Sequence, residues 1–197
     1  GLLQLHETPE CVYDVQPCPL DARLAAGKPP DVVIVADCRI DNRAELAEAL
    51  RIPGALLDVL PDSQLILAAY LHWGGECLRR LLGDYAFAIW DGRSQTLLCG
   101  RDPLGIKPFY YHLREDLFVM ASDIRAVAAH PQTPRRVDEQ ELARKLRYVP
   151  HIDPRTTYLQ NVVKLPPAHT LTLSAQAATL QHYWLPEEVS PLHLPTI

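Results

Sequence analysis

The chain has 197 residues, a formal net charge of −5 and a hydrophobic fraction of 48%. This composition is typical of a folded globular protein and excludes a wholly disordered chain. The negative net charge argues against a general binder of the nucleic-acid phosphate backbone, and no apolar run is long enough to span a membrane.

Cysteine and histidine usage predicts neither a disulfide framework nor a metal site. The eight histidines do not fall at ligand spacings, and His169 is expected to face solvent from a strand. The absence of a basic, apolar leader at the start of the sequence adds to the expectation of a reducing, cytoplasmic location. The five cysteines are scattered along the chain at Cys11, Cys18, Cys38, Cys77 and Cys99.

The pattern of apolar residues predicts alternating groups of helices and strands. The first 30 residues are rich in proline and are expected to be mostly loop. A buried strand over 32–36 precedes a helix capped by Asp41 or Asn42, and Asp62 is expected to cap the next helix, which ends at 74–75. A short helix at 77–82 follows. Further helices are expected at 123–130, capped by Ser122, and at 138–147.

Period-two alternation then predicts two hairpins in succession. Hairpins imply antiparallel sheet, so the fold class is α+β, with two antiparallel sheets and helices on their outer faces. Residues 1–185 are expected to form one domain, and the proline-rich residues 186–197 a linker or tail. The expected strands cover residues 85–90, 96–100, 108–112, 117–121, 162–164, 169–173 and 179–184.

The corner between two of these strands carries Arg101, Asp102 and Gly105. An arginine beside an aspartate at a strand end predicts a buried ion pair that braces the turn. A phosphate-binding loop is the alternative function for this segment. No P-loop, GxSxG or HExxH motif occurs anywhere in the sequence.

Several segments, taken in order, resemble the N-terminal glutamine amidotransferase domain of asparagine synthetase-like proteins. Residues 83–91, 101–108 and 121–126 carry most of this resemblance. Residues 37–42 stand in the place of that family's Asn-Gly-Glu-Ile-Tyr-Asn, and residues 164–169 are similar to its Leu-Pro-Pro-Gly-His. The nearest subgroup is the one found in peptide-modifying clusters, such as the lasso-peptide cyclases.

The resemblance implies an N-terminal-nucleophile hydrolase fold, an αββα sandwich, here lacking its first strand and helix. In that family a first-residue cysteine attacks the glutamine amide, and an asparagine helps to form the oxyanion hole. Here residue 1 is Gly1, and Leu3 or Gln4 stands where an arginine binds the glutamine carboxylate. Asp37 replaces the oxyanion-hole asparagine.

Two further positions complete the comparison with the family's glutamine pocket. Cys38 replaces the glycine that follows the asparagine, while Asp62 matches the carboxylate that binds the glutamine amino group. Asp37, Cys38 and Asp62 are therefore interpreted as the remnant of a glutamine pocket, with no catalytic residue among them. Cys38 as a replacement nucleophile is an alternative, but no histidine lies nearby in the sequence to act as its base.

The leading hypothesis is a degenerate amidotransferase-like domain that acts as a scaffold for a C-terminal synthetase domain, in cis or in trans. The family's ATP and Mg²⁺ bind in that synthetase domain, so no cofactor is expected in this chain. One alternative is an active glutaminase whose cysteine-bearing segment lies upstream of this sequence. Another is a module that binds a small ligand or peptide. Without its first strand the domain should expose a sheet edge, which predicts a possible homodimer.

Overall fold

The computed structural model describes residues 18–19, 31–148 and 153–188. Most of the first 30 residues, which are expected to be loop, and most of the expected tail lie outside these ranges. The expectation that the family's first strand and helix are missing also concerns residues outside these ranges, so it stays a prediction. Of the tail, Pro186–Glu188 forms a single 3₁₀ turn.

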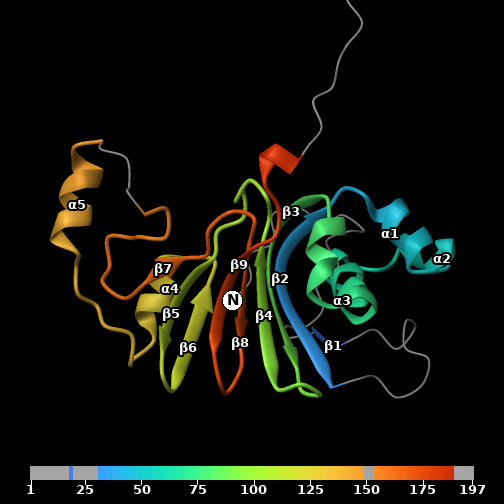
Figure 1. The fold of residues 1–197 in the computed structure, drawn as a ribbon, viewed down its shortest axis with the longest axis horizontal. Helices are drawn as coiled ribbons and strands as arrows, with labels where there is room; N and C mark the ends of the chain where they lie inside the picture. Colours follow the sequence, from blue (N-terminus) through green and yellow to red (C-terminus); the bar gives the residue numbers. More distant parts are fainter. Residues whose placement is uncertain (1–17, 20–30, 149–152, 189–197) are drawn as a thin grey trace, which may run out of the picture.

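A six-stranded antiparallel sheet runs through the centre of the molecule (Figure 1). β2 and β3 pair along their whole length, from Val32 opposite Asp91 to Ile40 opposite Gly83. Gly83 has a positive φ of 145°, and a Cβ there would clash with the carbonyl oxygen of Arg39. The strands, in spatial order, are β1 (Cys18–Pro19), β2 (Val32–Ile40), β3 (Gly83–Asp91), β4 (Thr96–Arg101), β8 (His169–Leu173) and β9 (Ala178–His182).

A smaller, three-stranded antiparallel sheet packs against the first. Its order is β6 (Leu117–Ala121), β5 (Tyr110–Arg114) and β7 (Val163–Lys164). Within the described part of the chain, β6 pairs only with β5, so one of its edges has no neighbouring strand there. The homodimer expected from such an edge stays a prediction.

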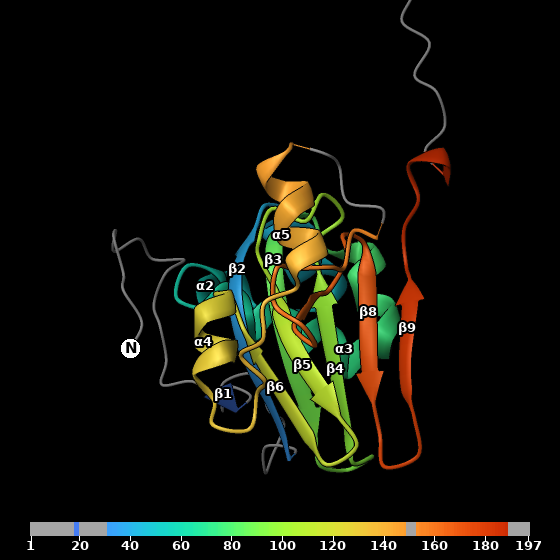
Figure 2. The ribbon, with the colours of Figure 1, turned by 90° about the vertical axis from the view of Figure 1, so that its left-hand side faces the viewer.

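Helices cover the outer faces of both sheets, which gives four layers (Figures 1 and 2). One group packs on the six-stranded sheet, with α3 against β2, and α4 packs on β5 and β6 of the smaller sheet. The expected αββα arrangement is therefore confirmed. The helices are α1 (Arg43–Ala49), α2 (Gly54–Leu57), α3 (Asp62–Trp73), the 3₁₀ helix η2 (Gly74–Arg80), α4 (Ile124–Ala129) and α5 (Glu139–Leu146).

Each pair of adjacent layers encloses its own apolar core. Ile34, Leu67 and Phe87 belong to the core between the larger sheet and its helices. Phe109 and Leu171 belong to the core between the two sheets. The third core lies between the smaller sheet and α4 and contains Ile124, Val127 and Val162.

Two helix caps differ from the sequence-based predictions. Pro61, rather than Asp62, is the N-cap of α3, so Asp62 is the first helical residue and its carboxylate is used elsewhere. Asp123, rather than Ser122, caps α4, and its side chain accepts a hydrogen bond from the Arg125 backbone N–H. Asn42 is the N-cap of α1, but its side chain makes no capping bond.

Candidate functional site

Asp37 lies near the end of β2, at a cavity between the two sheets. The cavity has a volume of about 320 Å³ and a mostly apolar lining, which includes Val35, Phe109 and Met120. Asp37 Oδ1 lies 2.6 Å from Lys107 Nζ, so an ion pair joins β2 to the loop before β5. The Asp37 side chain is 45% exposed, and solvent therefore reaches this pair.

Cys38 lies on the opposite face of β2 from Asp37, because neighbouring strand residues alternate between faces. It is half-buried and packs against the core beneath the helices, whereas Val35 packs between the sheets. Cys38 and Asp37, neighbours in the sequence, therefore face different layers.

Asp62 is buried, with only 3% of its surface exposed, and its carboxylate has protein partners on both oxygens. One oxygen accepts a hydrogen bond of 2.8 Å from the Ile40 backbone N–H, and the other pairs with the Arg43 guanidinium. Arg43 also donates to the carbonyl oxygens of Leu57 and Leu60. Arg43 thus neutralises the carboxylate that the resemblance assigns to binding an amino group.

The 101–107 turn is organised by two side chains that bond to different backbone groups. Arg101 donates to the carbonyl oxygens of Lys107, Gly105 and Leu165 at 2.6–2.7 Å. Asp102 is buried and accepts backbone N–H bonds from Leu104, Ile106 and Lys107. The expected direct ion pair is therefore replaced by two separate sets of bonds to the backbone.

Gly105 allows this turn to close. Its φ is +67°, and a Cβ would lie 2.7 Å from Pro167 Cγ and 3.2 Å from the guanidinium carbon of Arg101. Both the left-handed backbone and the lack of space favour glycine here. The guanidinium fills the turn with its carbonyl bonds, which makes bracing the turn the role best supported for Arg101.

Two buried tyrosines connect this turn to the end of the domain, a link that the sequence reasoning missed. Tyr183 donates a hydrogen bond of 2.7 Å to the carbonyl oxygen of Arg101, and its hydroxyl lies 2.9 Å from that of Tyr85. Burial raises the pKa of both hydroxyls, so both stay neutral. The only sequence signal was the place of Tyr183 at the end of the resemblance.

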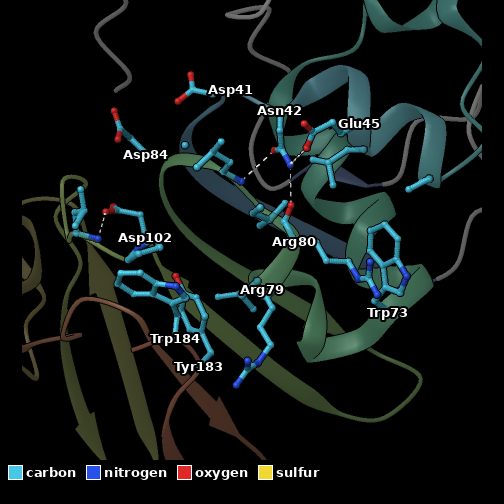
Figure 3. Close-up of a pocket in the computed structure, with 18 residues that line it drawn as sticks. Asp41, Asn42, Glu45, Trp73, Arg79, Arg80, Asp84, Asp102, Tyr183 and Trp184 are labelled. Atoms are coloured by element: carbon cyan, nitrogen blue, oxygen red, sulfur yellow. Dashed lines mark hydrogen bonds between the residues drawn. The ribbon is translucent and has the colours of Figure 1, made fainter. Parts of the chain in front are cut away.

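A pocket with a volume of about 770 Å³ opens on the outer side of this turn (Figure 3). Asn42 forms one wall, where its amide donates to Arg80 O and accepts from the Leu82 N–H. Arg80 stacks over the Trp73 ring at 4.7 Å. Across the pocket lie Asp102, Pro103, Leu104, Tyr183 and Trp184.

This pocket combines exposed apolar side chains with charged groups of both signs. Leu82 and Leu104 are 63% and 74% exposed, although both line the pocket. Asp41, Glu45 and Asp84 lie on the same lining. The pocket is open and apolar, and Arg79 and Arg80 lie on the same lining as these carboxylates, so its apolar surface is the feature that favours a partner.

The described residues form neither a metal-binding cluster nor a membrane-spanning helix. No three histidine, cysteine, aspartate or glutamate side chains gather there closely enough to hold a metal ion. None of the helices in that part of the chain combines the length and apolar character needed to cross a membrane.

Comparison with known proteins supports the fold described above. A family model described as a glutamine amidotransferase domain matches residues 25–184. Asparagine synthetase [glutamine-hydrolyzing] 3 of Bacillus subtilis is 32% identical over 151 residues, which is 77% of this chain and 25% of that protein. A putative asparagine synthetase of Mycobacterium tuberculosis is 46% identical over 83 residues, covering 42% of this chain and 13% of that protein.

Solved structures show the same fold at low sequence identity. Glutamine phosphoribosylpyrophosphate amidotransferase from B. subtilis, complexed with ADP and GMP, superposes with a TM-score of 0.56. It is 17% identical, and the match covers 87% of this chain and 32% of that one. The chain thus spans about a third of the solved enzyme and a quarter of the B. subtilis synthetase.

Proposed function

Because the chain belongs to the glutamine amidotransferase domain family, we propose that it is a degenerate member that does not hydrolyse glutamine and acts as a scaffold for an amide-forming synthetase domain. The observation that carries this proposal is the ion pair between Asp37 and Lys107. Asp37 stands where the family resemblance expects an asparagine that donates to the oxyanion. An ionised carboxylate only accepts hydrogen bonds, so it cannot fill that role.

The environment of Asp62 supports the same conclusion. In the resemblance this carboxylate binds the substrate's amino group. Here it is buried, and the Arg43 guanidinium already neutralises it. A second cation would have to displace Arg43, which also holds the carbonyl oxygens of Leu57 and Leu60. Glutamine recognition at this position is therefore disfavoured.

The scaffold role rests on the pocket beside Trp184. The matched family region ends at residue 184, and the asparagine synthetase relatives are several times longer than the match. Tyr183 and Trp184 line the pocket beside the exposed Leu82 and Leu104. We assign this face to the synthetase domain, in cis or in trans, and any ATP and Mg²⁺ to that domain. The lasso-peptide cyclase type of parent remains a prediction.

Glutamine hydrolysis by the native gene product tests the first half of the proposal. We expect no glutamate release above the uncatalysed rate, and calorimetry should detect no glutamine binding. Hydrolysis would show an active glutaminase, and binding without hydrolysis would show a ligand-binding module. The intact mass and N-terminal sequence of the same product would show whether the synthetase domain is joined in cis.

A matched pair of surface variants tests the docking face in the native gene product. Leu104 and Leu146 are 74% and 72% exposed, but Leu146 lies on α5, on the opposite side of the molecule from α1 (Figure 1), and only Leu104 lines the pocket. Leu104→Asp should weaken domain association and split one calorimetric unfolding transition into two, or release a separate synthetase subunit. Leu146→Asp should do neither. Identical behaviour of the two variants would refute the docking face.

A further inference from the structure

Two histidines lie directly opposite each other on β8 and β9, the hairpin at one edge of the larger sheet (Figure 2). His169 pairs with His182, and their ring centroids are 4.6 Å apart. The Tyr183 N–H donates to the Ala168 carbonyl oxygen, which makes the histidines a non-hydrogen-bonded pair. That register brings opposite side chains closest together in an antiparallel sheet.

A backbone carbonyl fixes the tautomer of His169. Its Nδ1 lies 2.7 Å from the Pro167 carbonyl oxygen. A carbonyl can only accept, so Nδ1 carries the proton and Nε2 keeps its lone pair. Metal-ligating histidines are commonly oriented by the same arrangement, in which the second ring nitrogen donates to a carbonyl. Burial also lowers the pKa of His169, which favours the neutral ring.

We propose that His169 and His182 form a two-ligand site for a late first-row divalent ion: Zn²⁺, Ni²⁺ or Cu²⁺. Imidazole nitrogen suits these metals. Two nitrogens on one tetrahedral zinc ion lie roughly 3.3 Å apart. The ring centroids are 4.6 Å apart, so we infer that rotation of the exposed His182 side chain brings its nitrogen to that spacing while His169 keeps its bond to Pro167. Water completes the coordination.

The surroundings define what kind of site this is. The positively charged Arg155 guanidinium disfavours additional positive charge at His169. However, this guanidinium forms an ion pair of 2.7 Å with the Asp153 carboxylate. No third protein ligand of the usual types gathers here among the described residues. The site therefore binds metal reversibly, unlike a four-ligand structural site. A bound ion would cross-link the edge strand β9 to β8 at the residue before Tyr183.

The test uses the untagged native protein, with Zn²⁺ calorimetry and electron paramagnetic resonance of bound Cu²⁺. We expect one ion coordinated by two imidazole nitrogens. His182→Ala should weaken Zn²⁺ binding by about tenfold or more and reduce the coordinating nitrogens to one. Metal should also raise the unfolding temperature of the wild type but not of the variant.

His72→Ala is the matched control, because His72 is exposed on α3 and its ring packs against Trp73. It should bind metal as the wild type does. His182 is exposed on an edge strand, so its removal leaves the fold intact, and circular dichroism without metal verifies this. Unchanged affinity and nitrogen count in both His182→Ala and His169→Ala would place the ion elsewhere and overturn the proposal. Absence of binding in the wild type would do the same.

Discussion

Replacing Arg43 with methionine tests whether this arginine neutralises Asp62. The Arg43 side chain is 16% exposed and that of Asp62 only 3%, so the pair is largely withdrawn from water. Removing one partner of a buried pair costs about 3–5 kcal/mol, because the other charge stays buried and uncompensated. Some water can reach Asp62 through the space that Arg43 leaves, so we expect the lower end, about 3 kcal/mol.

Urea unfolding followed by circular dichroism measures this loss of unfolding free energy. In a separate thermal unfolding experiment, a loss of about 3 kcal/mol in a chain of this size corresponds to a fall of about 6–12 °C in the unfolding temperature. Arg39→Met is the matched control. The Arg39 side chain is 63% exposed and lies 3.3 Å from the carboxylates of Asp41 and Asp84, so its loss should cost less than about 1 kcal/mol. Equal losses in the two variants would refute the reasoning, and Asp62 would remain available to a ligand.

Three further predictions concern single side chains. Under native conditions a thiol reagent should modify the half-buried Cys38 before Cys77, because burial raises the pKa of the Cys77 thiol to about 12; peptide mass mapping would reveal the order. Gly105→Ala should lower the free energy of unfolding by about 1–3 kcal/mol, since it puts a Cβ on a left-handed backbone; urea unfolding that matches the wild type would contradict this. Hydrogen bonds from Arg93 hold the pKa of Asp91 at about 2, below its ordinary 3.8. This lowered pKa stabilises the fold above pH 3.8, and the contribution disappears as the pH falls towards 2, so the unfolding temperature of Asp91→Asn should depend less on pH over that interval.

Local patterns were sufficient to predict most elements of the fold, although not the short helix α2. The β3–β4 hairpin follows from period-two alternation around an Asp-Gly turn, and α3 from helical spacing that ends at Gly74. The cap at Asp62 was wrong because a buried arginine from another helix competes for the same carboxylate. Local capping rules carry no information about such a partner.

The partners within the candidate site could not be read from the sequence, because they depend on how the layers pack. Lys107 reaches Asp37 from the loop before β5, and Tyr183 reaches Tyr85 from the far end of the domain. His169 was expected to face solvent, yet it is half-buried and contacts His182 on the neighbouring strand. Residue types indicated that these side chains were capable of such contacts, but only strand register and sheet order determine which pairs form.

The groups that stabilise this domain are largely separate from those that the family uses for chemistry. Arg101 and Asp102 bind backbone groups of the 101–107 turn and of Leu165, and Tyr183 binds the carbonyl oxygen of Arg101. These bonds do not involve the side chain of Asp37, which is half exposed at the inter-sheet cavity. An aspartate in place of the family's asparagine at position 37 would therefore abolish oxyanion binding at little cost in stability, because exposed ion pairs contribute less than about 1 kcal/mol. By contrast, loss of the turn network would leave buried polar groups unpaired. Mutations at position 37 cost little stability, whereas mutations in the turn network cost much more. Accumulating mutations would therefore remove catalysis first and keep the fold and the surface beside Trp184, which is the combination that a scaffold requires.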